Sequence, residues 1–157
     1  MARYHVDNRM AGTQQNLTTT FKTLAAVWSL TATLTRGRVN AIEIGPDGSP
    51  NATDCQIVYA IQRMTADGTG TVAPPSPLNS ADVASRMASK VNYTAEGTYA
   101  TNIWSRSLNQ RASMQWAAQD TDAMLTWAAT NLVGVALIAL SPVYAAPAFG
   151  ALEYDDL

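Results

Sequence analysis

Hydrophobic and polar residues alternate with a period of two along several parts of the chain, which is the pattern of strands with one buried face. In CQIVYAIQR (55–63) the cysteine, the tyrosine and both isoleucines share one side. TTTFKTLAAVWSL (18–30) is ambiguous, because its threonines favour a strand while Leu-Ala-Ala tolerates a helix. The alternation predicts strands over residues 38–44, 55–63, 98–104, 112–118 and 123–127.

The uncharged stretch NLVGVALIALSPVYAAPAFGAL (131–152) is long enough for a membrane-spanning helix, which needs about 20 apolar residues. However, Pro142 and Pro147 would each remove a helical hydrogen bond, and the flanks are acidic rather than basic. We therefore expect two strands of a soluble protein, at 132–140 and 148–154, joined by a proline-containing loop. The first is uniformly apolar, which is typical of a central strand buried on both faces.

One segment, NSADVASRMAS (79–89), predicts a short helix, because Asn79 or Ser80 can cap it and Asp82 suits its positive end. The segment APPSP (73–77) predicts a rigid extended connector, since proline fixes φ. Turn-forming residues separate the remaining elements at 45–54, 66–71 and 107–111.

These elements amount to roughly seven or eight short strands with one helical insertion. The predicted fold class is all-β: an antiparallel, jelly-roll-like β-sandwich with one short helix and an N-terminal arm. Residues 1–16 lack periodicity and are predicted to form the extended arm, and residues 17–157 a single β-sandwich domain. Because a segment with so little to bury orders only on binding, deletion of residues 2–14 is expected to leave the melting temperature nearly unchanged.

Charged residues make up only 14% of the chain, well below the usual quarter. The net charge of −2 provides no general attraction to nucleic acid or to an anionic membrane, so neither partner is expected. The low charge instead predicts a surface partly covered by other subunits, and therefore a homo-oligomer. The polar N-terminal residues lack the apolar segment of a signal peptide.

Residues suited to catalysis are scarce. His5 is the only histidine and lies in the predicted arm, so no serine or cysteine nucleophile has a base near a core position. Cys55 opens an apolar strand face, where an unreactive buried thiol is the default. One cysteine and one histidine also exclude a four-ligand zinc site of the Cys/His type. We therefore predict that the protein is not an enzyme and has no cofactor or metal.

Three features leave alternatives open. The Asp-Thr-Asp segment at 120–122 could hold calcium, although a hairpin turn is the preferred interpretation. Glu43 lies in a predicted strand and is expected to meet Arg36, Arg38 or Arg63 across the sheet, where such a pair would fix packing. The four tryptophans could stack against sugar rings, but aromatic residues at alternating strand positions more often belong to a core.

The order of segments resembles a known family. The chain contains RGRVNAIEIGPDGSPNATDCQIVYAIQRMTADGTGT (36–71), then NYTAEGTYATNIWSRSLNQRASMQW (92–116), NLVGVALIAL (131–140) and a terminal GALEYDD (150–156). This pattern resembles small virion proteins of tailed bacteriophages, of the capsid decoration or cement type. The motifs that carry the resemblance span Gly45 to Asp54, Gln62 to Thr69, and Asn109 to Trp116.

The resemblance implies a β-sandwich without catalysis that forms oligomers, often trimers, and binds and stabilises the outside of a shell of major capsid protein. The implied location is the capsid exterior of the virion, after synthesis in the cytoplasm of a bacterial host. The alternative is a tail or head-fibre component that binds a receptor or carbohydrate. The likeness is weakest before Arg36. Because arginine and aromatic residues anchor interfaces, we take Arg3, Tyr4, His5 and Arg9 in the arm as the candidate interface.

Overall fold

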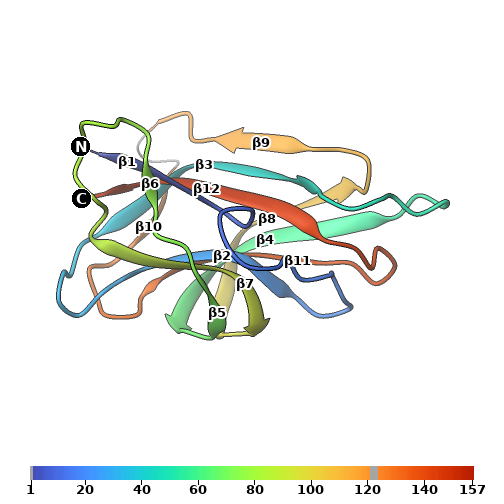
Figure 1. The fold of residues 1–157 in the computed structure, drawn as a ribbon, viewed down its shortest axis with the longest axis horizontal. Helices are drawn as coiled ribbons and strands as arrows, with labels where there is room; N and C mark the ends of the chain where they lie inside the picture. The colour runs from blue at the N-terminus through green and yellow to red at the C-terminus, as the bar shows by residue number, and fades with distance from the viewer. Residues whose placement is uncertain (1, 121–123) are drawn as a thin grey trace.

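The computed structural model describes residues 2–120 and 124–157, which form two antiparallel β-sheets and contain no helix (Figure 1). No segment of these ranges is therefore a helix that could cross a membrane. The first sheet holds both ends of the chain. Its strands are β1 (Arg3–Asp7), β3 (Gly37–Pro46), β6 (Ser76–Pro77), β9 (Met114–Ala117), β10 (Leu125–Trp127) and β12 (Ala148–Asp156).

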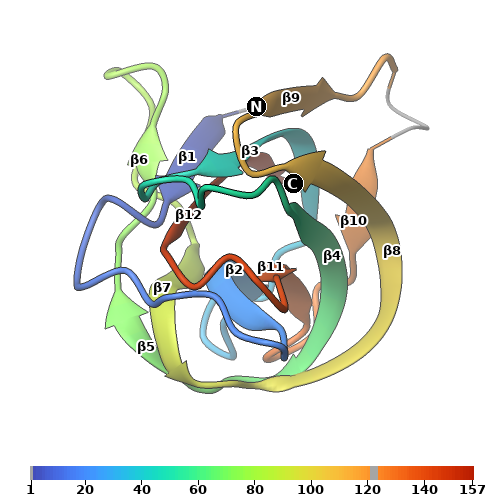
Figure 2. The same ribbon diagram turned by 90° about the vertical axis from the view of Figure 1, so that its right-hand side faces the viewer.

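The strands of the first sheet follow the order β10-β3-β12-β1-β6, and β9 also pairs with β3. The second sheet has the order β5-β7-β2-β11-β4-β8. Figure 2 shows the two sheets as separate layers, with β8 outermost on one side. The strands of the second sheet are β2 (Lys22–Ser29), β4 (Gln56–Ala66), β5 (Thr69–Val72), β7 (Met87–Ala95), β8 (Thr98–Asn109) and β11 (Gly134–Leu140).

The main hydrophobic core lies between the two sheets, because its side chains come from the facing sides of both. The alternation predicted for residues 55–63 is confirmed, since Ile57, Tyr59 and Ile61 are fully buried in this core. Burying such a side chain contributes roughly 1.5–3 kcal/mol. The first sheet contributes Tyr4, Val6, Val39, Ile42, Ile44, Trp127, Leu152 and Tyr154 to the same cluster.

A second apolar cluster lies on the opposite face of the second sheet, where Trp28, Met64, Tyr93 and Ile138 pack together. The turns between β4 and β5 and between β7 and β8 meet beside it, because Thr69 pairs with Ala95 on one side and Ala66 with Thr98 on the other. These two hairpins bend toward each other in Figure 1. The central strands β2 and β11 are therefore buried on both faces.

The apolar run near the C-terminus forms two strands, as predicted. β11 is buried on both faces between β2 and β4, which confirms its assignment as a central strand. β12 does not pair with β11, however, because it enters the first sheet between β3 and β1. Pro142 and Pro147 lie in the connection that carries the chain from one layer to the other.

The helix predicted at 79–89 is wrong, because residues 79–82 form a turn, residues 83–86 continue without regular structure apart from a bend at Arg86, and β7 begins at Met87. Asn79 does act as a cap, since its side-chain oxygen accepts the Ala81 N–H at 3.1 Å. Beyond it, tertiary partners hold the backbone groups that a helix would use. The Val83 carbonyl accepts from the Tyr4 hydroxyl at 3.0 Å, and the Arg86 N–H donates to an Asp156 carboxylate oxygen at 3.1 Å.

The prediction of an arm outside the core is wrong for residues 3–7, because they form β1 between β12 and β6. Tyr4 and Val6 alternate inward and are fully buried. Asn8 is also buried, and its side chain bridges the Ala148 carbonyl and the Gly150 N–H at 2.7 and 3.0 Å. The alternation extends over two apolar positions only, which is too short a pattern to mark a strand in the sequence.

Candidate functional site

The candidate interface residues Arg3 and Tyr4 lie on β1 and are engaged within the protein. Arg3 Nε lies 3.5 Å from an Asp155 carboxylate oxygen. Tyr4 is fully buried, its hydroxyl donates to the Val83 carbonyl, and its ring centroid lies 5.6 Å from that of Tyr154. Tyr4 is thus a core residue, which sequence reasoning placed on an interface.

His5 and Arg9 are also held by neighbours. His5 Nε2 lies 2.9 Å from an Asp7 carboxylate oxygen. Arg9 binds both carboxylate oxygens of Asp47, through Nε at 2.9 Å and Nη2 at 2.5 Å, and lies 4.2 Å over the Phe149 ring. This bidentate contact lowers the pKa of Asp47 and raises that of Arg9. Contacts within the protein therefore hold all four candidate residues in place.

A different set of side chains is free to contact a partner. Five exposed large hydrophobic residues lie on segments at the end of the molecule that holds both termini, and we call them the terminal surface. Their exposed fractions range from 38% to 74%. Single exposed apolar residues are ordinary, so the five are of interest as a group because their segments lie at one end of the molecule (Figure 1). The terminal surface comprises Leu30, Leu34, Leu78, Val83 and Leu157.

Hydrogen bonds join the segments that carry the terminal surface. The loop after β2 meets the loop before β7, because the Thr33 hydroxyl donates to the Arg86 carbonyl at 2.6 Å. The Thr35 hydroxyl donates to the Leu157 carbonyl at 2.6 Å. The Leu78 N–H donates to the Arg3 carbonyl at 2.9 Å. The exposed side chains therefore stand on one connected platform rather than on independent loops.

An arginine-lined pocket of about 440 Å³ opens next to Leu157. It gathers the three arginines that were expected to meet Glu43, whereas Glu43 instead lines a small hollow beside His5 on the first sheet. We call the larger pocket, of about 440 Å³, the arginine pocket. Its lining residues are Arg36, Arg38, Arg63, Thr126, Trp127, Ala128 and Leu157.

An apolar groove of about 260 Å³ lies where the connector after β5 passes β7. Its walls include Trp28, Val72, Pro74 and Met87. Val72 is 64% exposed, so the groove extends apolar surface along the edge of the second sheet. Lys90 also lines the groove, but its ammonium group is paired with the Asp67 carboxylate at 2.5 Å.

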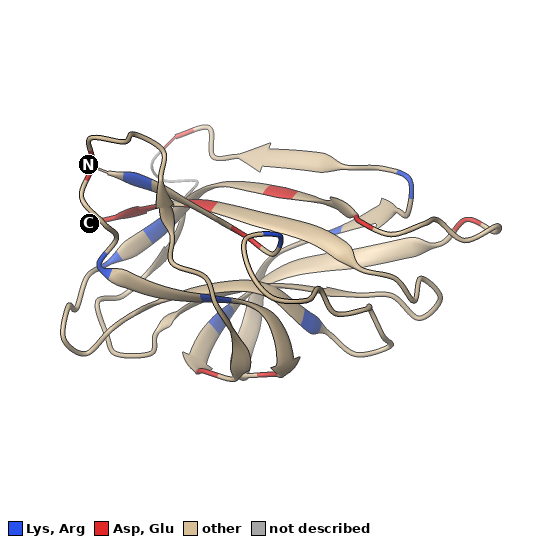
Figure 3. Ribbon diagram, in the orientation of Figure 1, with Lys and Arg blue, Asp and Glu red and all other residues tan. Residues whose placement is uncertain are grey.

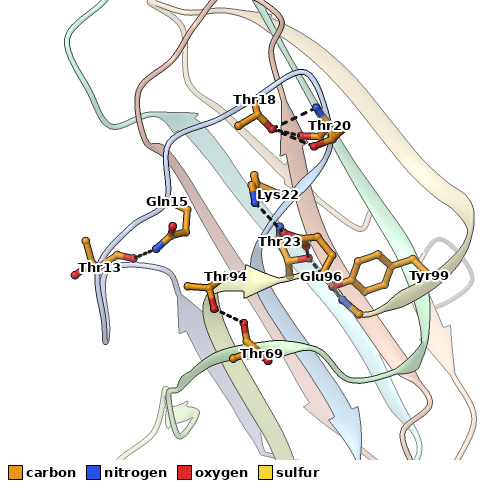
Figure 4. Close-up of polar contacts among 11 residues, drawn as sticks. Thr13, Gln15, Thr18, Thr20, Lys22, Thr23, Thr69, Thr94, Glu96 and Tyr99 are labelled. Carbon is orange, nitrogen blue, oxygen red and sulfur yellow. Dashed lines mark hydrogen bonds and ion pairs between the residues drawn. The ribbon is translucent and has the colours of Figure 1, made fainter.

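A polar network closes the outer face of the second sheet (Figure 4). One Glu96 carboxylate oxygen accepts from the Thr23 hydroxyl and N–H at 2.5 and 3.0 Å, and that hydroxyl lies 2.5 Å from the Tyr99 hydroxyl. Lys22 lies 3.8 Å from the other Glu96 oxygen. Burial is the main cause that raises the pKa of Tyr99. These groups satisfy one another, which fits a structural role.

The tryptophans do not form an exposed stacking platform. Trp28, Trp104 and Trp127 are buried, and Trp116 is half-buried with its ring centroid 6.4 Å from that of Trp104. The indole rings therefore serve the core, which was the preferred interpretation of their strand positions. Cys55 is half-buried, and its thiol donates to the Gln110 side-chain oxygen at 3.3 Å.

Among residues 2–120 and 124–157, no group of three or more His, Cys, Asp or Glu side chains is placed to hold a metal ion. The calcium alternative at 120–122 includes residues outside the described ranges. No family model, curated protein or solved structure matches this chain significantly.

Sequence reasoning missed both the terminal surface and the arginine pocket. The leucines of the terminal surface lie in loops, where no periodicity separates an exposed apolar residue from a buried one. The pocket combines residues from β3, β4, β10 and the C-terminal segment, which are far apart along the chain. The one available signal was the spacing of Arg36 and Arg38, which in a strand share a side.

Proposed function

We propose that this protein is a structural component of a tailed-bacteriophage virion, a decoration protein that binds the outside of a shell of major capsid protein and stabilises it. The phage assignment rests on the order of segments between residues 36 and 155. The two packed antiparallel sheets suit the jelly-roll-like sandwich that the resemblance implies. The proposal assigns the protein to the capsid exterior and gives it no catalytic role.

The terminal surface is the observation that carries the binding role. It places large apolar side chains on hydrogen-bonded loops at one end, so little ordering is needed when a partner covers them. Arg36 and Arg86 stand on the same loops, and arginine beside apolar residues is the composition of many interface centres. The proposal thus moves the attachment site from β1 to the terminal surface.

We further propose that the protein is a homo-oligomer, with a trimer as the leading form. Only 14% of the residues are charged, and Val72 and the groove beside it add apolar surface outside the terminal surface. Subunits in a ring can use one surface for each other and a second one for the shell. Several weak contacts to the shell then act together in one attached oligomer.

The fibre alternative has less support. A carbohydrate-binding module needs exposed aromatic rings, and the four indole rings are buried or half-buried. The two functions differ in copy number, because a decoration protein covers the whole shell whereas a fibre component occupies a few positions.

Electron microscopy of phage particles assembled with and without this chain tests the proposal. We expect extra density over the whole shell when the chain is present, and particles that release their genome at a lower temperature when it is absent. Density confined to a tail or a single vertex would support the fibre alternative. Particles that contain none of the protein would refute both.

A further inference from the structure

The arginine pocket gathers three guanidinium groups, and an ion pair to Asp155 holds one of them, Arg38. Asp155 is the carboxylate that pairs with Arg38, and it is already engaged: Arg38 Nε donates to one oxygen at 3.0 Å, and the Asn40 amide donates to the other at 2.7 Å. Arg3 lies 3.5 Å from that second oxygen. Asp155 is almost fully buried, so its remaining capacity to neutralise other groups is small.

Arg36 and Arg63 have no ion pair within residues 2–120 and 124–157. One Arg63 nitrogen, Nη1, donates to the Thr126 carbonyl at 2.7 Å, which holds the guanidinium over β10. Arg36 is fixed through its backbone, since its carbonyl accepts the Leu157 N–H at 2.8 Å. Two exposed guanidinium groups therefore line one pocket with most of their donors unused.

We propose that the arginine pocket binds a carboxylate side chain of a partner protein, presented between apolar residues. Guanidinium groups match carboxylates in geometry and bind them through charge-assisted hydrogen bonds. The rim of the pocket is apolar, since Leu157 and Ala128 line it and Leu34 lies two residues from Arg36. A partner carboxylate flanked by apolar residues therefore fits it. This inference rests on the proposed function, since it states the chemistry of the group that the terminal surface meets.

The surroundings favour a single carboxylate over an extended polyanion. The whole chain has a net charge of −2, and Asp155 and Asp156 directly precede the pocket residue Leu157 in the chain. Figure 3 shows red segments beside the blue ones at the end that holds both termini. Nucleic acid would bring further phosphates against these carboxylates, whereas an acidic side chain on an apolar segment would not.

Side-chain NMR of the full chain tests the proposal, with arginine Nε–Hε and Trp127 Nε1–Hε1 signals as the readout. The probes are acetyl-Leu-Asp-Leu-amide, the uncharged acetyl-Leu-Asn-Leu-amide, and inorganic phosphate. We expect the aspartate peptide to shift the Arg36, Arg63 and Trp127 signals saturably, and to bind more tightly than either other probe. Tighter binding of phosphate, equal binding of the asparagine peptide, or no saturable shift would overturn the proposal.

Two variants and a matched control locate the effect. Arg36→Gln removes a guanidinium that makes no ion pair in the described chain, so the fold should be retained. Arg63→Gln also removes no ion pair there, and it loses only the hydrogen bond to the Thr126 carbonyl. Each should weaken aspartate-peptide binding by at least about tenfold, the size of one lost charge-assisted hydrogen bond. Arg106→Gln, an exposed arginine on β8 outside the pocket, should leave binding unchanged. Equal losses in all three variants would mean that overall charge is responsible and would overturn the site.

The outcome is independent of the phage assignment. If the peptide binds as expected but the protein is absent from phage particles, the pocket stands and the proposed function fails. If the protein decorates particles but the peptide does not bind, the proposed function stands and this inference fails.

Discussion

The two ends of the molecule differ in what their loops expose after the polar groups of those loops have formed hydrogen bonds and ion pairs. At the end opposite the termini, loop polar groups are bound to one another: Arg9 and Gln14 hold Asp47, the Tyr144 hydroxyl accepts the Gly48 N–H at 3.0 Å, and Arg111 holds Asp54. At the end with the termini, hydrogen bonds also join the loops, but large apolar side chains are exposed there, and so are two arginines that make no ion pair with any residue that the structure describes.

This difference indicates which end is built to meet a partner. A loop cluster whose polar groups satisfy each other gains little when another surface covers it, because desolvation offsets the new contacts. Exposed leucine and valine side chains gain roughly 25 cal/mol for each Å² that a partner covers. At the far end, only Val143 is an exposed large hydrophobic residue among those the structure describes.

The largest effect on stability is expected from removing the buried Tyr4 ring at the end of the molecule that holds the termini. Tyr4→Ala deletes a buried ring that packs on Tyr154, and it should lower the free energy of unfolding by about 3–5 kcal/mol. Urea denaturation followed by tryptophan fluorescence measures the loss. Tyr4→Phe keeps the ring and should cost only about 1 kcal/mol, the value of its hydrogen bond to Val83.

An equal loss in both Tyr4 variants would show that the hydroxyl, not the ring, stabilises this end. Deletion of residues 2–14 should also be strongly destabilising, which reverses the expectation from the sequence. That expectation treated the segment as having little to bury, whereas β1 buries Tyr4 and Val6 between two neighbouring strands.

The fold could be predicted where a strand carries its own pattern. β4, with alternating apolar residues, and β11, uniformly apolar, can both be located because their burial repeats over many residues. β5 and β6 cannot, because they are short edge strands whose residues are partly or fully exposed. The start of β7 falls within the predicted helix because Asn79 caps a turn that tertiary hydrogen bonds then redirect.

The candidate site could not be predicted to the same extent. Residue type alone favours Arg3 and Arg9 as interface residues, but their carboxylate partners, Asp155 and Asp47, lie far along the chain. Which arginines stay uncompensated depends on pairings across the sheet, and these are fixed only when β12 enters between β1 and β3.

The second prediction compares two glycines on β3, one at each end of the molecule. A Cβ on Gly37 would overlap the indole ring of Trp127 and the methyl group of Met87. Gly37→Ala should therefore destabilise the protein by about 1–3 kcal/mol, and it should shift the Trp127 indole signal. At Gly45 the nearest atom, Ser113 Cβ, would lie 3.1 Å from the added carbon, so Gly45→Ala should cost clearly less. Similar losses by differential scanning calorimetry would show that both ends are packed equally tightly.

The third prediction concerns the ion pair at the far end. Arg9 lowers the pKa of Asp47, so this carboxylate stabilises the fold above its unfolded-state pKa of about 4, and the contribution is lost as the pH falls through the lower folded-state value. Because the Arg9 side chain is half exposed, Asp47→Asn should reduce stability at neutral pH by about 1 kcal/mol or less. Denaturation at neutral pH and in strong acid should show the difference from the unmodified protein shrinking with acid. A difference that stays constant would assign the effect to packing.

The smallest effect on stability, and the most informative one for function, is expected at the terminal surface. Leu34 and Val83 are 53% and 74% exposed. Leu34→Ser combined with Val83→Ser should therefore change the free energy of unfolding by no more than about 0.5 kcal/mol per site. The same double variant should lose most of its binding to phage shells in a co-sedimentation assay, because both side chains leave the surface that a partner would cover.

Val143 provides the matched control for the double variant at the opposite end. Its side chain is 57% exposed, and Val143→Ser removes a comparable apolar group, so this variant should bind shells normally. If Val143→Ser weakens binding as much as the double variant does, attachment does not distinguish the two ends. The loss of binding would then follow from removing any exposed apolar side chain, and the terminal surface would not be the attachment site.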